Sequence, residues 1–365
     1  MGLIRFLLAV SVIIAHSTPI FGNILIGGQT AVQAFFILSG FYMTLVLREK
    51  YINQNNSYKL FITNRLLRIY PLYWSVLALT IIYSIVFIGI NQNTEGLVLN
   101  NYINHKDKFD FSSLFLLIFS NMFIIFQDVV MFFGINTNRA LIFTPDYSIT
   151  SPMLWTFLFI PQAWSISLEI LFYIIAPFIL RKKTIIIFVI VLITFLLRII
   201  GYNYGLIYDP WSYRFFPFEL GYFLVGSLSY VFYKKINQTK INSLILFSFF
   251  ALILLYTLIY PNFGILTNYI YLIIFSIALP FIFILTKNSK FDAYIGNLSY
   301  PLYVSHIFIY FVIKTLDIPY VKNSGIKLTL ISILFSVFLH EVIGKRVEAI
   351  RQFRLSKSTK KAVIV

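Results

Sequence analysis

Two ionisable side chains, Arg5 and His16, lie within the first apolar stretch of the chain. Ionisable groups in membrane hydrocarbon are costly, so each is a candidate functional residue. Eleven helical residues make about three turns, so both side chains share one face and lie about 16 Å apart. We interpret this face as a polar track that begins at the cytoplasmic surface and ends at a reactive imidazole. The simpler alternatives are a surface anchor for Arg5 and a helix-cap role for His16.

A second pair of candidates is Arg65 and Arg68, which are three residues apart and share a helix face. Two adjacent guanidinium groups suit the phosphates of a nucleotide-containing donor, because arginine binds phosphate in a bidentate way. Simple anchoring at the cytoplasmic surface is the alternative. Pro71 follows and predicts a break in the helix as the next membrane span begins.

Glu169 lies about a turn and a half below Trp164, an aromatic residue of the type that marks a membrane interface. Its neighbours on the same helix face, one turn away on either side, are Ser165 and Tyr173. A carboxylate at this depth needs a partner, and we expect it to be His16 or Arg214. Arg214 could instead hold an acidic acceptor group or a lipid headgroup.

The second apolar run carries Gln33 at a depth similar to that of His16. Small residues in this run favour close packing against the first helix. They are Gly28, Ala31, Ala34, Ser39 and Gly40. We take Gln33 and Ser39 as supporting candidates, with a packing interface as the alternative.

Three polar residues share one helix face in the ninth apolar run, namely Ser299, Tyr303 and His306. His306 lies near the middle of the predicted span. A lone histidine there is more often a hydrogen-bonded packing group than a catalyst. We therefore take the three residues as supporting, acceptor-side candidates.

The composition indicates a polytopic membrane protein, because 59% of the 365 residues are hydrophobic and only 12% are charged. The net charge of +16 comes from basic residues beside apolar runs, so it faces anionic headgroups and not nucleic acid. The absence of cysteine excludes disulfides, thiolate metal sites and a cysteine nucleophile. No HExxH, P-loop, GxGxxG or GxSxG motif is present, and we expect no metal site.

Apolar runs of about 17–22 residues can cross a bilayer as helices. We expect ten such spans, at 3–20, 28–47, 68–90, 157–180, 184–201, 214–233, 241–260, 267–286, 294–314 and 326–344. Ten spans place all basic clusters and both termini on one side, which the positive-inside rule makes the cytoplasm. The expected fold is all-α, with one membrane domain at 1–345, a basic cytoplasmic tail at 346–365 and no appended soluble domain.

One apolar run, 111–126, is left out of this count. As a span it would move three basic clusters to the outside, and Ser112, Ser113, Ser120 and Asn121 interrupt it. We expect a re-entrant or interfacial segment within a long outer connection at 91–156. An eleventh span is the alternative.

These segments, in this order, resemble the acyltransferase-3 family of bacterial integral-membrane acyltransferases over nearly the whole chain. The matching stretches are Arg5 with His16, VQAFFILSGF at 32–41, RLLR at 65–68, WSISLE at 164–169, Arg214 with Phe218 and Gly221, and LSYPLYVSH at 298–306. One departure is Gln33, where many members carry aspartate. Some relatives also carry a fused extracytoplasmic esterase-like domain, which this sequence lacks.

The resemblance implies transfer of an acyl group, commonly acetyl, from cytoplasmic acyl-CoA to hydroxyls of cell-surface glycans or their lipid-linked precursors. It also implies that Arg5, His16 and the Arg65–Arg68 pair matter for activity, with acyl-CoA as a substrate and no permanently bound cofactor. The expected location is the bacterial inner membrane. The acceptor sugar, the acyl chain and the oligomeric state are left open.

The residues allow a mechanism in which Arg65 and Arg68 hold the CoA phosphates and the pantetheine arm follows Arg5 toward His16. Neutral imidazole would then act as general base on an acceptor hydroxyl, with Glu169 orienting it. An acyl-histidine relay is an alternative route. Two other classes compete with an enzyme: a transporter or flippase of a lipid-linked saccharide, and an assembly subunit without a site.

Overall fold

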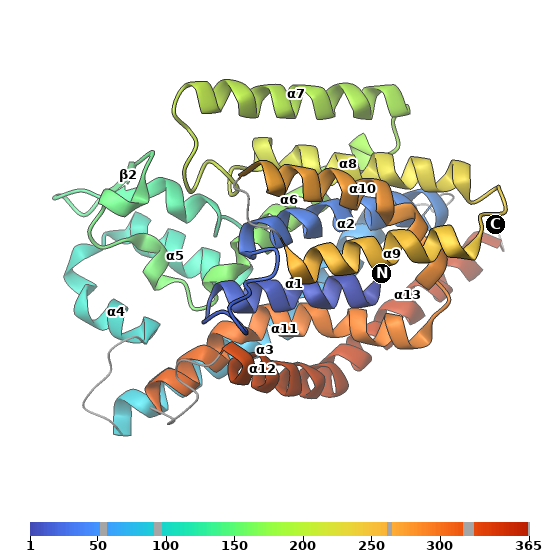
Figure 1. Cartoon of the computed structure of the whole chain (residues 1–365). Helices are drawn as coiled ribbons and strands as arrows, with labels where there is room; N and C mark the ends of the chain where they lie inside the picture. Colours follow the sequence, from blue (N-terminus) through green and yellow to red (C-terminus); the bar gives the residue numbers. More distant parts are fainter. Residues whose placement is uncertain (52–56, 91–96, 261–264, 317–324, 364–365) are drawn as a thin grey trace.

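The computed structural model describes residues 1–51, 57–90, 97–260, 265–316 and 325–363. Its long helices lie side by side along a common direction, and a smaller group of elements gathers at one end of them (Figure 1). The long helices are α1 (Gly2–Ala15), α2 (Gly28–Glu49), α3 (Ser57–Ile90), α6 (Trp164–Ile179), α7 (Thr184–Asn203), α8 (Phe216–Ile236), α9 (Ser243–Ile259), α10 (Ile265–Thr286), α11 (Lys290–Thr315), α12 (Gly325–Leu339) and α13 (Lys345–Val363). A π-helical turn, His340–Gly344, joins α12 to α13.

The smaller group lies between α3 and α6 in the sequence and forms what we call the end region. It contains α4 (Val98–Asn104), α5 (Phe111–Phe123), strands β1 (Phe133–Ile135) and β2 (Leu141–Phe143), and 3-10 turns at Lys106–Lys108, Val129–Phe132, Tyr147–Ile149, Leu154–Phe157 and Pro161–Ala163. The two strands form an antiparallel hairpin in which Phe133 pairs with Phe143 and Gly134 with Ile142. The end region therefore packs as a small unit beside the long helices (Figure 1).

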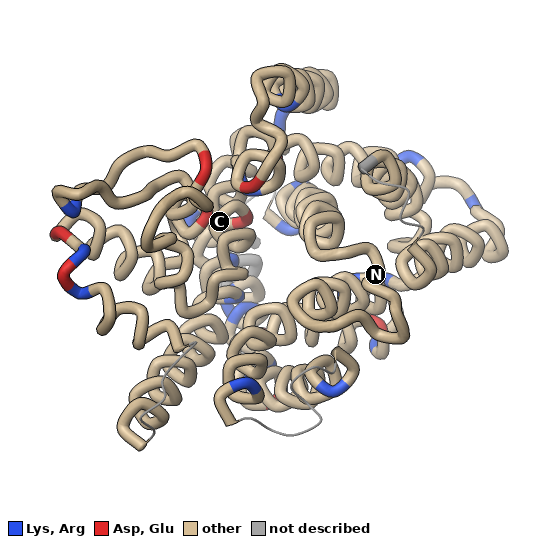
Figure 2. Tube along the Cα trace, turned by 60° about the vertical axis from the view of Figure 1, so that its left-hand side comes forward, with Lys and Arg blue, Asp and Glu red and all other residues tan. Residues whose placement is uncertain are grey.

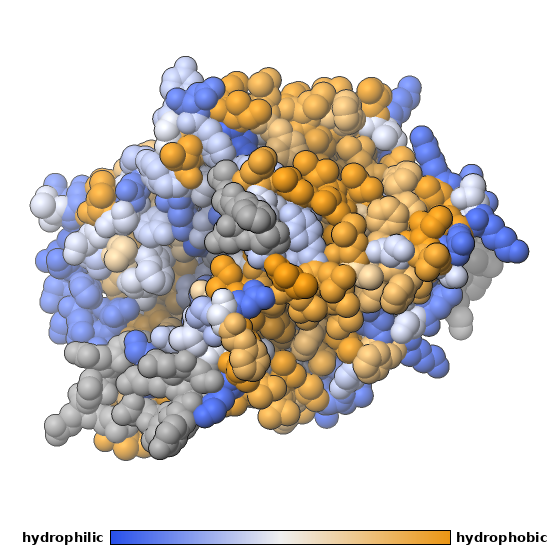
Figure 3. Space-filling view, viewed as in Figure 1, coloured by the Kyte–Doolittle hydropathy of each residue, from blue (hydrophilic) through white to orange (hydrophobic). Residues whose placement is uncertain are grey.

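Each of the ten predicted spans overlaps a helix, but α1 ends at Ala15 within the span predicted at 3–20, and α6 begins only at Trp164 within the span predicted at 157–180. The protein is an all-α, multi-pass membrane protein. Within the described ranges, six helical stretches are long and apolar enough to cross a bilayer: Gly28–Glu49, Tyr58–Ile90, Pro161–Ile179, Thr184–Asn203, Leu266–Thr286 and Gly325–Ser356. A broad hydrophobic surface covers the helices, with hydrophilic patches at both ends (Figure 3), and most of the trace carries no charge (Figure 2). The count of ten spans and the side of the termini stay predictions.

The predicted break at Pro71 is wrong, because α3 continues through this residue. Proline removes one backbone hydrogen bond, and membrane helices tolerate it because packed neighbours satisfy the freed groups. Here the turn around Pro71 is fixed against the end of α5, whose last carbonyl groups would otherwise lack donors. The bonds run from Tyr70 to the Phe123 carbonyl, from Tyr73 to the Asn121 carbonyl (2.6 Å) and from Trp74 Nε1 to the Met122 carbonyl (2.8 Å).

Helix α5 occupies the run that we predicted to be re-entrant or interfacial. Its 13 residues span about 20 Å, less than the hydrocarbon core of a bilayer. Its outer face is apolar and open, with Phe111 85% exposed. The C-terminal end of α5 contacts α3 within two turns of Arg68. This arrangement supports a segment that enters the membrane region without crossing it as one straight helix.

Helices α2 and α8 approach each other closely at two glycines. A Cβ on Gly40 would lie 1.7 Å from the Phe223 carbonyl oxygen, and one on Gly226 would lie 1.9 Å from the Ile37 carbonyl oxygen. Small residues allow such backbone approach where helices pack in lipid. The sequence analysis expected the small residues of the second run to pack on the first helix, but Gly40 faces α8.

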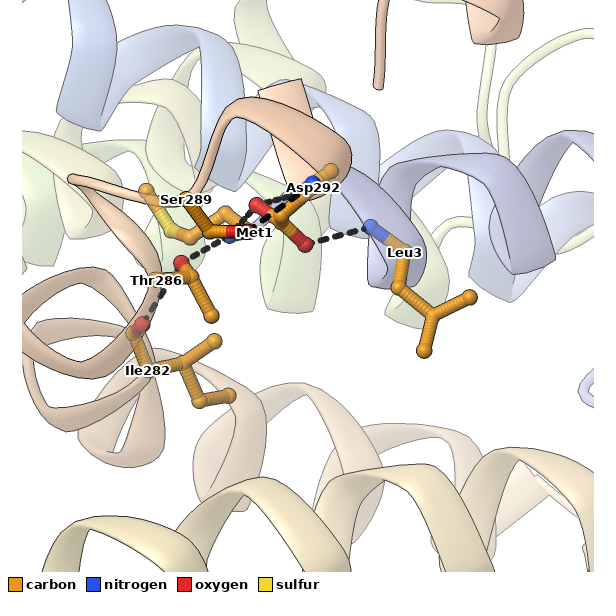
Figure 4. Close-up of polar contacts among 7 residues, drawn as sticks. Met1, Leu3, Ile282, Thr286, Ser289 and Asp292 are labelled. Carbon is orange, nitrogen blue, oxygen red and sulfur yellow. Dashed lines mark hydrogen bonds and ion pairs between the residues drawn. The ribbon is translucent and has the colours of Figure 1, made fainter. Parts of the chain in front are cut away.

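The start of α1 is fixed to the start of α11 by Asp292 (Figure 4). The carboxylate accepts hydrogen bonds from the backbone N–H groups of Gly2 (2.6 Å) and Leu3 (2.9 Å), and it pairs with the Met1 ammonium (2.6 Å). Burial alone would raise the pKa of Asp292, but these bonds lower it. A carboxylate at a helix N-terminus also satisfies free N–H groups. This contact sets the position of Arg5 one turn further along α1.

Candidate functional site

A cavity of about 390 Å³ opens where α1, α2, α3, α10, α11, the π-helical turn and α13 meet. We call it the arginine cavity. Its charged lining residues are Arg5, Lys50, Arg65, Arg68, Lys287 and Arg351 against Asp292 and Glu348. The cavity therefore brings together the three arginines that the sequence analysis assigned to donor binding. Its lining is strongly positive.

The guanidinium groups of Arg5, Arg65 and Arg68 make no hydrogen bond or ion pair with the residues that the structure describes. Arg65 is only 4% exposed, and its Nε is buried without a partner. Arg48 shows the usual arrangement, since its guanidinium donates to the Leu180 carbonyl oxygen at 3.1 and 2.9 Å. Buried polar groups are normally paired. Three unpaired arginines around one cavity thus point to an anionic ligand that carries several oxygens.

A second cavity of about 110 Å³, which we call the inner cavity, adjoins the arginine cavity. The two share four lining residues, Arg5, Tyr42, Arg68 and Tyr300. The inner cavity is also lined by the predicted site residues Ser39, Ser165, Glu169, Tyr173, Ser299 and Tyr303. A ligand anchored at the arginines can therefore extend a narrow arm along α2, α6 and α11.

Glu169 has other partners than the two that we predicted. Its Oε1 accepts hydrogen bonds from the Ser39 hydroxyl (2.8 Å) and from the Tyr173 hydroxyl. Neither Arg214 nor His16 contacts it among the described residues. The carboxylate thus faces the inner cavity, and the structure does not place it where it could orient the imidazole.

Arg214 pairs with Asp209, which the sequence analysis did not consider. Its Nε and Nη2 donate to the two carboxylate oxygens at 2.6 and 3.1 Å. The guanidinium lies over the Trp164 ring, 4.3 Å from the centroid, and Tyr147 and Tyr213 donate to Asp209 Oδ2 at 2.8 and 3.1 Å. A fork-like ion pair stacked on an aromatic ring is a rigid unit. It fixes the end region onto the first turn of α6.

His16 is the first residue after α1, and it faces His306 of α11 with 5.2 Å between ring centroids. His16 Nδ1 lies 2.8 Å from the Val12 carbonyl oxygen. A carbonyl only accepts, so Nδ1 carries a proton, and in the neutral imidazole the lone pair is therefore on Nε2. His306 repeats this arrangement, with Nδ1 2.7 Å from the Tyr303 carbonyl oxygen and a buried Nε2 without a partner among the described residues. A neutral His16, which is exposed, thus has the tautomer that a general base acting through Nε2 needs.

His16 lines neither cavity. The inner cavity ends at Phe35 and Tyr303, whose rings are 6.3 Å apart, and Tyr303 in turn contacts His306 at 6.0 Å. The Tyr303 hydroxyl is held by Ser165 Oγ at 2.7 Å and donates to the Gln162 carbonyl oxygen at 2.9 Å. The polar track along α1 is therefore interrupted in this state. The side chains of Tyr303 and Phe35 separate the inner cavity from the His16 imidazole.

Gln33 belongs to a buried ionic cluster that the sequence analysis missed. Its Nε2 donates to Glu219 Oε1 at 3.3 Å, and the same oxygen pairs with Arg198 Nη2. The guanidinium also contacts the rings of Phe218 and Tyr222. The pair joins α7 to α8 and thereby to α2. Arg198 and Glu219 are each a single charge in a long apolar run, which is the same signal that marked Arg5 as a candidate and could have marked these two residues.

Replacing Glu219 with leucine should destabilise the protein by about 3–5 kcal/mol, because Arg198 would remain buried without a counter-charge. The double variant Arg198→Met with Glu219→Leu should recover most of this loss. Thermal unfolding in detergent measures both. The control is Glu341→Gln, which breaks the exposed pair with Lys345 and should leave stability nearly unchanged. A double variant as unstable as the single one would contradict this role.

Asp128 is a buried carboxyl in the end region. It is 3% exposed and accepts a hydrogen bond from Ser167 Oγ at 2.6 Å. Burial raises the pKa of Asp128 from 3.8 to about 6, although the Ser167 hydroxyl acts to lower it. The folded state thus favours the protonated form. Its stabilising contribution is present below about pH 4 and is lost as the pH rises to about 6.

Asp128→Asn should therefore remove a pH dependence, because the amide oxygen still accepts from Ser167 but cannot ionise. Wild type should lose stability relative to this variant between pH 4 and pH 7, by about 3 kcal/mol in all. Melting temperatures in detergent across this range test it. Asp107→Asn, at an exposed aspartate of the same region, is the control. Parallel pH profiles for wild type and Asp128→Asn would contradict the prediction.

Among the described residues, no three His, Asp or Glu side chains gather where they could hold a metal ion. The arrangement combines a positively charged cavity, a narrow polar arm and a histidine beyond it. Such a set can bind a phosphate-bearing donor and remove a proton from a nucleophile.

The family model described as an acyltransferase domain, that of the acyltransferase-3 family, matches residues 1–340. The chain belongs to this family and is a membrane acyltransferase. A protein of Aquifex aeolicus (strain VF5), described as uncharacterized, is 28% identical over 213 residues, which cover 55% of this chain and 92% of that protein. No solved structure matches.

Proposed function

We propose that this acyltransferase moves an acyl group, most simply acetyl, from acyl-CoA to a hydroxyl of a surface polysaccharide or lipid-linked glycan at the bacterial cytoplasmic membrane. The observation that supports this proposal most is the group of unpaired arginines in the arginine cavity. CoA carries three phosphate groups at one end and a narrow, uncharged pantetheine arm at the other. Its shape and charge fit a wide positive cavity that continues into a narrow one.

The proposed donor position has the diphosphate at Arg65 and Arg68 and the pantetheine arm in the inner cavity. Arg5 and Arg68 line both cavities, so they lie where the diphosphate of CoA would join its pantetheine arm. Movement of Tyr303 and Phe35 would then let the thioester reach His16. The hydroxyls and carboxylate of the inner cavity offer hydrogen bonds to the amides of the arm.

The proposed chemical step is attack of an acceptor hydroxyl on the thioester carbonyl. His16 Nε2 takes the hydroxyl proton, the new ester C–O bond forms and the C–S bond breaks. The proton on the imidazole then passes to the departing thiolate, so that CoA leaves as a thiol. The Nδ1 hydrogen bond to Val12 stays in place throughout and holds the ring. An acyl-histidine relay would use the same Nε2 lone pair as the nucleophile.

Binding of acetyl-CoA to the purified protein without any acceptor tests this function. We expect saturable binding that competes with CoA and weakens as the salt concentration rises. A transporter of lipid-linked saccharides would not recognise CoA, and no finding supports that alternative. Absence of CoA binding by a folded, monodisperse protein would overturn the proposed donor.

A further inference from the structure

Helix α13 forms one wall of the arginine cavity. It follows the π-helical turn, lies beyond the residues that match the family, and packs on α3. Five of its residues line the cavity: Val347, Glu348, Arg351, Gln352 and Leu355. The sequence analysis assigned this stretch to a basic cytoplasmic tail. The structure describes its backbone to residue 363 and its side chains to 356.

Arg351 is the cation that α13 contributes to the cavity. It is only 6% exposed, and its Nε donates to the Asn64 carbonyl oxygen at 2.9 Å, directly beside Arg65. Its Nη1 pairs with Glu348, whose side chain is 43% exposed. Its Nη2 makes no hydrogen bond with a described residue. The Arg351 guanidinium is therefore held in one orientation, and its Nη2 can still donate hydrogen bonds to a ligand.

The charge around Arg351 does not balance within the cavity. Arg351 lies close enough to Arg65 and Arg68 to repel them, and an exposed partner such as Glu348 compensates little. The Asp292 carboxylate already accepts hydrogen bonds from backbone N–H groups at the start of α1, so it does not compensate the arginines. Gathering three arginines is costly unless an anion joins them. The uncompensated positive charge therefore favours a further phosphate beyond those at Arg65 and Arg68.

We propose that Arg351 binds the 3′-phosphate of the CoA donor; this inference rests on the proposed function. Arg5 and Arg68 line both cavities, whereas Arg351 lines only the arginine cavity. The thioester must point toward the inner cavity, and the 3′-phosphate on the adenosine ribose is the phosphate farthest from it. The fixed Arg351 guanidinium, which lines the arginine cavity alone, is therefore assigned to that phosphate. Helix α13 thereby becomes part of the donor site.

The test compares CoA with 3′-dephospho-CoA on purified full-length protein, as wild type and as Arg351→Gln. Loss of one charge-assisted contact should weaken CoA binding about 10- to 100-fold and leave 3′-dephospho-CoA binding unchanged. The matched control is Arg354→Gln, which also removes a bond between α13 and α3, from Arg354 Nη2 to Thr63 Oγ1 (2.9 Å), but at a residue outside the cavity lining. It should bind both probes as wild type does.

Melting temperatures of the two variants show whether α13 stays docked. Equal weakening of both probes in Arg351→Gln, or no weakening of either, would overturn the assignment of Arg351. Failure of wild type to bind CoA would instead overturn the proposed function itself, so the two failures are distinguishable.

Discussion

His16→Ala is expected to lower the rate of acyl transfer by about 10²–10⁴-fold while leaving acetyl-CoA binding near the wild-type level. The imidazole supplies the lone pair that removes the acceptor proton, and it lines neither cavity that would hold the donor. Transfer of labelled acetyl from acetyl-CoA to glycan, measured with enriched membranes, gives the rate. Equilibrium binding of acetyl-CoA gives the affinity of the variant for the donor.

The chain offers a matched control for this variant in His105. This residue also follows the end of a helix, α4, and its Nδ1 lies 3.1 Å from the carbonyl oxygen of Asn101, four residues earlier. His105→Ala therefore removes the same kind of helix-end contact away from the site. It should retain wild-type activity. If His16→Ala folds and transfers acetyl at the wild-type rate, the general-base and the relay mechanisms are both wrong.

Arg68→Gln is expected to weaken acetyl-CoA binding about 10- to 100-fold, because a hydrogen bond to a charged group contributes about 1.5–3 kcal/mol. Arg68 is the arginine of α3 that lines both cavities, so its loss affects both the phosphates and the entry of the arm. The salt dependence of binding should also become shallower, since one fewer cation faces the donor. Binding isotherms at several salt concentrations measure both effects.

The control for Arg68 is Arg48→Gln. Arg48 lies in the last turn of α2, donates to the Leu180 and Lys182 carbonyl oxygens and lines neither cavity. Its loss should reduce stability without changing the affinity for acetyl-CoA. Equal affinities for wild type and Arg68→Gln at low salt would show that the donor phosphates bind elsewhere.

The helices could be predicted from the sequence because their apolar runs are long and the basic clusters separate them. Arg5 was found because it lies within an apolar stretch, and Arg65 and Arg68 because they share one helix face; the structure brings all three to one cavity. The partners of the buried charges could not be predicted. Glu169 shares a depth with several cations, and only the packing of α2 against α6 decides that Ser39 reaches it.

Two further features depend on tertiary contacts that leave no pattern in the sequence. Pro71 was expected to end a helix, but the end of α5 supports α3 on both sides of it. Arg351 was expected in a basic tail, where one arginine among many basic residues looks like an anchor. Its burial follows from the π-helical turn that directs α13 onto α3.

The most direct test of the account is NMR analysis of the surface polysaccharide from cells with and without the gene, complemented by wild type or by His16→Ala. The account predicts that an O-acyl signal is lost without the gene, returns with wild type and does not return with His16→Ala. The same spectra would name the acyl group and the sugar position. An unchanged acylation pattern, with an altered amount or length of polysaccharide, would contradict acyl transfer to the glycan.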